Sequence, residues 1–110
     1  MSETTNPSPA FSVEVRDQDG VPVVFVRGEV DVHTAPQLRE TVRRLLDDGA
    51  STLLVDMEQT EFIDSTGLGV LLGAAKELQQ AGGRFTLARP SKAVSKILSV
   101  TGMSELFDVT

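Results

Sequence analysis

Two adjacent hydroxyl side chains, Ser65 and Thr66, lie where the apolar pair Phe62-Ile63 ends and an amphipathic helix is expected to begin. A serine at a helix start has two ordinary roles. Its hydroxyl can cap the helix by accepting a bond from a backbone N–H group. It can also carry a phosphate, which the unpaired N–H groups and partial positive charge of the helix terminus tolerate. The local residues alone favour capping, because serine is a common N-cap.

A phosphate on Ser65 would strongly change the charge of its surroundings. Phosphorylation adds roughly −1.5 to −2 charges at neutral pH. The residues that precede the serine are already acidic, and they include Asp56, Glu58, Glu61 and Asp64. A partner that docks here has to accommodate the added charge, so this segment has the chemistry of a binding surface that phosphorylation switches off.

Three glycines, Gly67, Gly69 and Gly73, follow the hydroxyl pair. Their spacing approaches a dinucleotide-binding fingerprint, but the expected turn precedes them, and Leu68 to Leu72 already has helical spacing. Glycine inside a helix costs roughly 0.5–1 kcal/mol relative to alanine, so the glycines need a reason. Two remain open: close packing of the helix on a sheet, and an exposed small-residue face that a partner approaches. These glycines also leave open another candidate function, that of a small nucleotide- or ligand-binding domain that uses this segment.

The sequence offers little for catalysis or for metal binding. It contains one histidine, His33, and no cysteine, which is a poor set of ligands for a transition metal. Ser65 also lacks the G-x-S-x-G pattern of a hydrolase nucleophile, since Ile63 stands at the first glycine position. We expect no enzymatic activity and no bound cofactor.

Composition excludes further classes of protein. The chain has 110 residues, enough for one domain, and a formal net charge of −6, which argues against nucleic acid and anionic membranes as partners. No apolar run approaches the ~20 residues of a membrane span, and we expect a cytoplasmic protein. Residues 1–10 are polar and contain proline, so we predict a flexible leader followed by a single domain at 11–110.

Hydrophobic periodicity predicts an α/β domain in the order β-β-α-β-α-β-α-β. The sheet is expected to be mixed, because it opens with an antiparallel hairpin and continues with a strand that is apolar on both faces. Thr34, with Gln37 three residues later, predicts a capping box. The expected elements are strands at 11–16 and 22–30, a helix at 34–49, a strand at 52–56, a helix at 65–82, a strand at 84–88, a helix at 91–102 and a strand at 106–109.

Two motifs carry a family resemblance. Asp64-Ser65-Thr66-Gly67-Leu68-Gly69 resembles the signature of bacterial anti-sigma factor antagonists, the STAS-domain family. Upstream, Gly28-Glu29-Val30-Asp31-Val32-His33-Thr34-Ala35 resembles the family's G-E-[LI]-D-x-x-[TN]-A element. The resemblance covers Phe11 to Thr110 and implies a single STAS domain. The family usually continues with one more helix after the last strand, so either this chain is truncated after Thr110 or this member of the family is short.

The resemblance also implies a function without catalysis. Such proteins bind an anti-sigma factor that is a serine kinase of the histidine-kinase-like ATPase fold, and this binding releases the sigma factor. The kinase phosphorylates the serine after the motif's aspartate, here Ser65, and the phosphorylated protein dissociates. A PP2C-type phosphatase restores it. A non-switching STAS scaffold subunit of a stress-signalling complex is the alternative within the family.

Carried over by position, the resemblance makes Ser65 the phosphate acceptor, with Thr66 as a secondary candidate. The second motif, at the expected distance, reverses the preference for capping that the local residues give. The partner-binding residues implied by the two motifs are Glu29, Asp31, Asp64, Ser65, Thr66, Gly67, Leu68 and Gly69.

Overall fold

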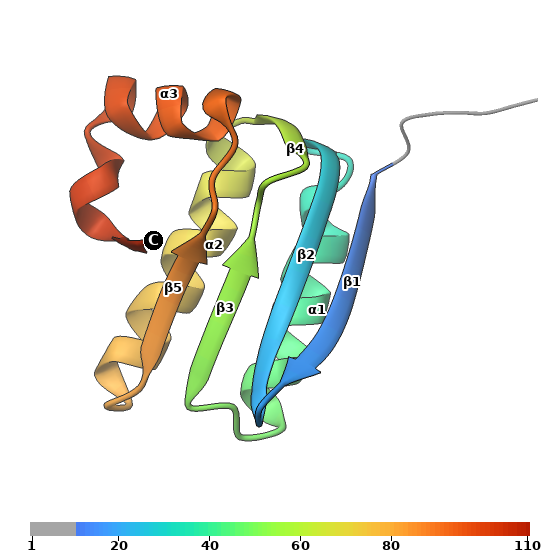
Figure 1. The fold of residues 1–110 in the computed structure, drawn as a ribbon, viewed down its shortest axis with the longest axis vertical. Coiled ribbons are helices and arrows are strands. Elements are labelled where there is room, and N and C mark those ends of the chain that lie inside the picture. The colour runs from blue at the N-terminus through green and yellow to red at the C-terminus, as the bar shows by residue number, and fades with distance from the viewer. Residues whose placement is uncertain (1–10) are drawn as a thin grey trace, which may run out of the picture.

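The computed structural model describes residues 11–110 (Figure 1), and the predicted leader lies outside them. It confirms an α/β domain with a mixed sheet. In chain order the elements are β1 (Ser12–Gln18), β2 (Val21–Val30), α1 (Ala35–Asp47), β3 (Thr52–Asp56), β4 (Thr60–Ile63), α2 (Ser65–Gln80), β5 (Arg84–Ala88), α3 (Lys92–Thr101), the 3-10 helix η1 (Met103–Leu106) and β6 (Asp108–Val109).

The sheet is organised around the long strand β2. The predicted hairpin is confirmed: β1 pairs with β2 in antiparallel fashion, and all other pairings are parallel. Its two-residue turn holds Asp19 at φ 56° and Gly20 at φ 86°, the positive values that a tight hairpin turn requires. The strand order is β1-β2-β3-β5-β6. Further along, β2 also pairs with β4 through residues 28–30.

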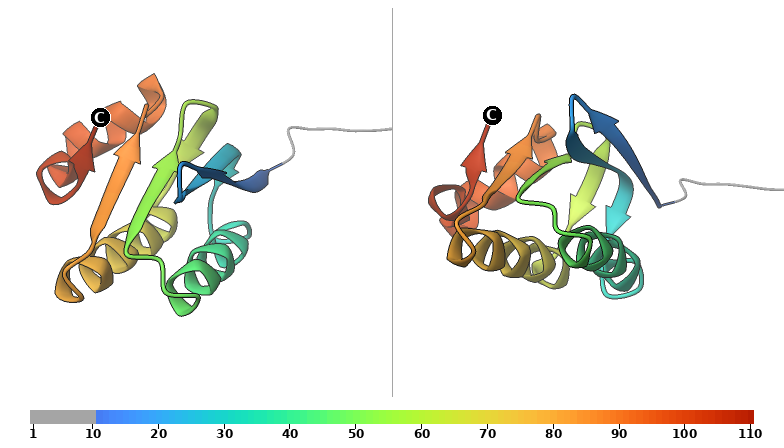
Figure 2. Two further views of the ribbon diagram at one scale, coloured as in Figure 1. Left: turned by 60° about the horizontal axis from the view of Figure 1, so that its bottom comes forward. Right: turned by 90° about the horizontal axis from the view of Figure 1, so that it is seen from below.

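Helices α1 and α2 lie side by side against one face of the sheet (Figure 2), and α3 packs against β4. Alternation along β2 sends Val24, Val26 and Val30 into the core beneath the two helices, with each at most 1% exposed. The amphipathic faces of the helices complete this core, with Leu38 from α1 and Leu71 from α2 fully buried. No helix in the described part of the chain is long and apolar enough to cross a membrane.

Two sequence predictions about element ends are wrong in part, and one short strand was not predicted. The Thr34 side chain does not cap α1, because its hydroxyl instead donates to the carbonyl of Glu29 (2.8 Å) and accepts from the N–H of Asp31 (2.9 Å). Strand β4 was not predicted, since it is only four residues long and becomes a strand through pairing with β2. The last strand starts at Asp108, two residues later than predicted, because the preceding residues form η1.

Both ends of α3 follow the sequence prediction. The Ser91 hydroxyl accepts a bond from the N–H of Val94 (3.2 Å) and caps the N-terminus. Gly102 ends the helix in the left-handed conformation, at φ 73°, where glycine avoids the steric penalty of a Cβ atom.

Candidate functional site

The two sequence motifs meet at the carboxyl ends of β2 and β4. Glu29 lies opposite Phe62 and Val30 opposite Ile63 in the parallel pairing. One step further, the N–H of Asp64 donates to the carbonyl of Val30 (3.1 Å). The turn that leads into α1 and the start of α2 are therefore neighbours, as expected where parallel strands end at one edge of a sheet.

Ser65 is the first residue of α2, and its side chain is exposed. Ser65 does not have the capping role that the local residues alone favoured, because Asp64 is the N-cap: the backbone of Asp64 is extended, and its carboxylate accepts the N–H of Gly67 (3.1 Å). Within residues 11–110 the Ser65 hydroxyl has no hydrogen-bond partner. In the structure Asp64 caps the helix, and Ser65 keeps an exposed hydroxyl, whereas the sequence left both roles open for Ser65.

Asp31 organises the turn between β2 and α1. Its Oδ1 atom accepts from the N–H groups of His33 (2.9 Å) and Thr34 (3.1 Å). These bonds, led by that from His33, lower the pKa of the Asp31 carboxyl. The carboxylate consequently holds the loop beside Ser65 in shape, while the neighbouring Val32 and His33 side chains remain exposed.

We expect the stability that Asp31 provides to depend on pH. Because folding lowers the pKa of this group, its contribution is present above the ordinary value of 3.8 and is lost as the pH falls through the folded value. Asp31→Asn keeps Oδ1 as an acceptor and removes only the charge. The melting temperature of this variant should fall below wild type at neutral pH, and the difference should shrink in acid. A difference that stays constant down to about pH 3 would contradict the charged turn.

The glycines of α2 divide between the two explanations left open by the sequence. Gly67 is buried, and a Cβ atom there would lie 2.6 Å from Cγ1 of Val30 and 2.7 Å from Cγ1 of Ile63. Close packing therefore explains Gly67, and Leu68 beside it is only 3% exposed. At Gly69 and Gly73 an added Cβ would meet open space, so packing does not explain these two.

A groove of about 250 Å³ runs between α1 and α2 beside Gly69 and Gly73. Since Ser65, Gly69 and Gly73 are spaced four residues apart, they follow one side of α2. The exposed hydroxyl and the groove are consequently parts of one surface. Sequence reasoning missed the α1 side of this surface. The groove is lined by Arg39, Val42, Arg43, Leu46, Gly69, Val70, Gly73, Ala74 and Glu77.

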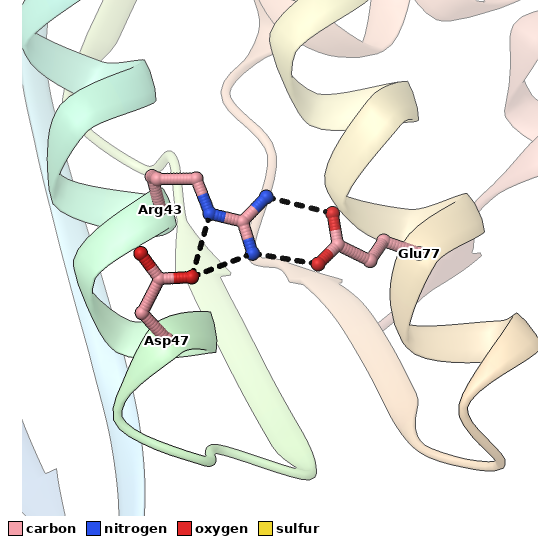
Figure 3. A network of polar contacts seen from close by, with 3 residues as sticks. All are labelled: Arg43, Asp47 and Glu77. Carbon is pink, nitrogen blue, oxygen red and sulfur yellow. Dashed lines mark hydrogen bonds and ion pairs between the residues drawn. The ribbon is translucent and has the colours of Figure 1, made fainter.

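An ion network ties α1 to α2 at this groove (Figure 3). The Arg43 guanidinium binds both carboxylate oxygens of Glu77, at 2.8 and 2.6 Å, and Oδ1 of Asp47 at 3.0 Å. Glu77, followed by Asp47, raises the pKa of Arg43, and Arg43 in turn lowers the pKa of Glu77. Between 47% and 65% of each side chain is exposed, so solvent screening limits the contribution of this network to stability.

The glycines of α2 do not lie where a dinucleotide-binding motif would place them. The glycines lie inside α2 and not in a strand-to-helix turn, so their N–H groups do not form a phosphate-binding loop. Among residues 11–110, no cluster of three or more His, Asp or Glu side chains is arranged to hold a metal ion. What the surface offers is a free hydroxyl, carboxylates and a small-residue groove.

Comparisons with known proteins agree with the geometry. The STAS domain family model matches residues 12–110, and the chain belongs to the STAS-domain family. An anti-sigma-B factor antagonist of Listeria monocytogenes is 31% identical over 100 residues, covering 90% of this chain and 88% of that protein. The crystal structure of an anti-sigma factor antagonist from Mycobacterium paratuberculosis has a TM-score of 0.83 and 31% identity, covering 93% of this chain and 87% of that one.

A Bacillus relative is known in two chemical states. The anti-sigma factor antagonist SpoIIAA in its unphosphorylated form has a TM-score of 0.69 and 27% identity, covering 92% of this chain and 87% of that chain. The phosphorylated form of the Bacillus cell fate determinant SpoIIAA has a TM-score of 0.69 and 28% identity, covering 92% of this chain and 91% of that chain. This fold therefore accommodates a phosphate in that relative.

Proposed function

We propose that this protein is an anti-sigma factor antagonist controlled by phosphorylation of Ser65. The unphosphorylated form binds an anti-sigma factor that is a serine kinase of the histidine-kinase-like ATPase fold, and this releases a sigma factor in the cytoplasm. Phosphorylation ends the binding, and a PP2C-type phosphatase reverses it. The protein itself is a binding partner and substrate, and it catalyses nothing.

The free Ser65 hydroxyl carries this proposal. The Ser65 side chain is exposed and therefore accessible to a kinase. Because Asp64 is the residue that caps α2, modification of Ser65 does not remove the cap. The first-turn N–H groups of α2 and the helix dipole favour a negative group at this position. The phosphorylated and unphosphorylated forms of SpoIIAA, a protein of similar fold, support the same chemistry here.

The docking surface we propose combines exposed and supporting residues. Glu29, Ser65 and Gly69 are exposed, and Asp31, Asp64 and Thr66 are half-buried around them. Gly67 and Leu68 are buried and act by positioning the start of α2 on β2 and β4. The partner is thus expected to contact the α2 N-terminus, the β2–α1 turn and the adjoining groove.

The decisive experiment measures phosphate transfer. The kinase is first captured from cells with Ser65→Ala as bait and then incubated with ATP and purified protein. We expect wild type and Thr66→Ala to gain one phosphoryl group, about 80 Da, by mass spectrometry. Ser65→Ala should gain nothing yet still bind the kinase, since only the acceptor oxygen is lost.

The outcomes separate the candidate functions. Single-site modification of Ser65→Ala would refute Ser65 as the acceptor, and loss of modification in Thr66→Ala alone would transfer the role to Thr66. A wild-type protein that enters a stable complex but never accepts phosphate would support the non-switching scaffold. Binding of a nucleotide by the isolated protein would support the ligand-binding alternative.

A further inference from the structure

Among residues 11–110, strand β1 forms an open edge of the sheet. Within this described part of the chain it pairs only with β2, and the pairing starts next to the two-residue turn, at Gln18 opposite Val21. Residues that flank such a turn exchange both backbone hydrogen bonds, and the pattern then alternates along the strand. Every second N–H and C=O therefore points to the open edge, at Val13, Val15 and Asp17.

This edge is only partly protected against pairing with another strand. Natural edges are blunted by charged side chains, proline or a β-bulge. Strand β1 carries the charges of Glu14, Arg16 and Asp17, but it has no proline, and its register with β2 is continuous over all seven residues. Val15, at the centre of the strand, is 41% exposed. The open backbone groups of Val15 are thus accessible to a strand of the same length.

The charges of β1 are complementary to those of a second β1. When two copies run antiparallel with Val15 opposite Val15, all seven residues pair, and Glu14 lies opposite Arg16 of the second copy. This contact occurs twice, in the non-hydrogen-bonded positions where side chains approach most closely. Shifting the register one pair either way sets Glu14 against Glu14 or Arg16 against Arg16. The charges therefore select the centred register.

We propose that β1 is a homodimerisation edge, through which two copies of this chain join their sheets around a two-fold axis at Val15. Contacts within the monomer already orient the Glu14 and Arg16 side chains that would meet across the dimer. Arg16 binds both oxygens of Glu14 at 3.0 Å within the strand, and its guanidinium lies 4.7 Å from the centre of the Phe25 ring. In the dimer, the two pairs form a ring of alternating charge, and each interface surface is the same patch of both copies.

Sedimentation equilibrium of the full chain, up to about 1 mM, tests this proposal. Wild type should show a monomer–dimer equilibrium. Glu14→Arg and Arg16→Glu should each weaken it roughly tenfold, because every attractive cross-strand pair becomes repulsive. Mixing the two variants should restore association as a heterodimer, and the double exchange E14R/R16E should restore the homodimer. Lys76→Glu on α2 changes the net charge as Arg16→Glu does and should leave dimerisation unchanged.

A backbone variant tests the edge itself. Val15→Pro removes an N–H group that the hairpin does not use, so the fold tolerates it while the dimer is lost. Circular dichroism confirms folding of each variant. Wild type that stays monomeric at the highest concentration would overturn the proposal. So would charge-reversed variants that dimerise like wild type, or a mixture that fails to associate. These outcomes leave the Ser65 switch untouched, because that switch is read out by phosphate transfer.

Discussion

Replacing Gly67 with alanine is expected to lower the free energy of unfolding by about 1–3 kcal/mol, the usual cost of overpacking a core. The new Cβ atom would lie within 2.7 Å of the Cγ1 atoms of Val30 and Ile63, and these two residues are at most 2% exposed. These carbons are close to the backbone of two paired strands, so they cannot rotate away as the end of a long side chain would. Thermal unfolding should report a lower melting temperature, by roughly 4–8 °C for each kcal/mol.

Gly69→Ala is the matched control, two residues along the same helix. Its Cβ atom meets open space, and alanine is the better helix former by roughly 0.5–1 kcal/mol, so the protein should become slightly more stable. Partner affinity should nevertheless fall, because the added methyl group enters the proposed docking surface. Wild-type stability of Gly67→Ala would contradict the packing explanation. Unchanged kinase affinity of Gly69→Ala would remove this glycine from the docking surface.

Ser65→Glu is expected to weaken binding to the kinase by roughly 10–100-fold, since like charges brought together at an interface cost several kcal/mol. The exposed position of Ser65 puts the new carboxylate directly on the surface, next to Asp64, whose N–H donates to the carbonyl of Val30, the residue before Asp31. The α2 terminus tolerates a negative group, so melting should change little. Isothermal titration with the captured kinase measures the loss.

Ser65→Gln separates charge from size in this experiment. Glutamine has nearly the shape of glutamate and no charge, so its affinity should remain much closer to wild type. Equal weakening by glutamine and glutamate would show that bulk, and not charge, switches off binding. Wild-type affinity of Ser65→Glu would contradict switching by charge.

Much of this architecture was predictable because it rests on local signals. The hairpin follows from alternating apolar residues and the Asp19-Gly20 turn. The ends of α3 follow from Ser91 and Gly102, whose capping bonds lie within four residues, although Ser91 also donates to the carbonyls of Met57 and Thr60. The two motifs likewise stand in the sequence as written, and they were sufficient to indicate the family that the comparisons show.

The sequence by itself determined the order of all elements except β4 and η1, the candidate caps and the presence of a hydroxyl at the start of α2. Only the tertiary structure decided which of the candidate side chains caps each helix and which hydroxyl remains exposed. Ser65 and Asp64 are both good caps, and the choice depends on where β4 ends, which the bond from Asp64 to Val30 sets. The Thr34 side chain does not cap α1, because its hydroxyl donates to the Glu29 carbonyl near the end of β2.

The glycines show the same division. Gly67 and Gly69 are alike in sequence, but one faces Val30 and Ile63 and the other faces open space. Likewise, the small-residue groove required α1, whose residues are about thirty positions away from those of α2. Local patterns encode conformational preference and capping potential. Packing, and the freedom of a hydroxyl to react, depend on contacts between residues far apart in the chain, and these exist only once the sheet has formed.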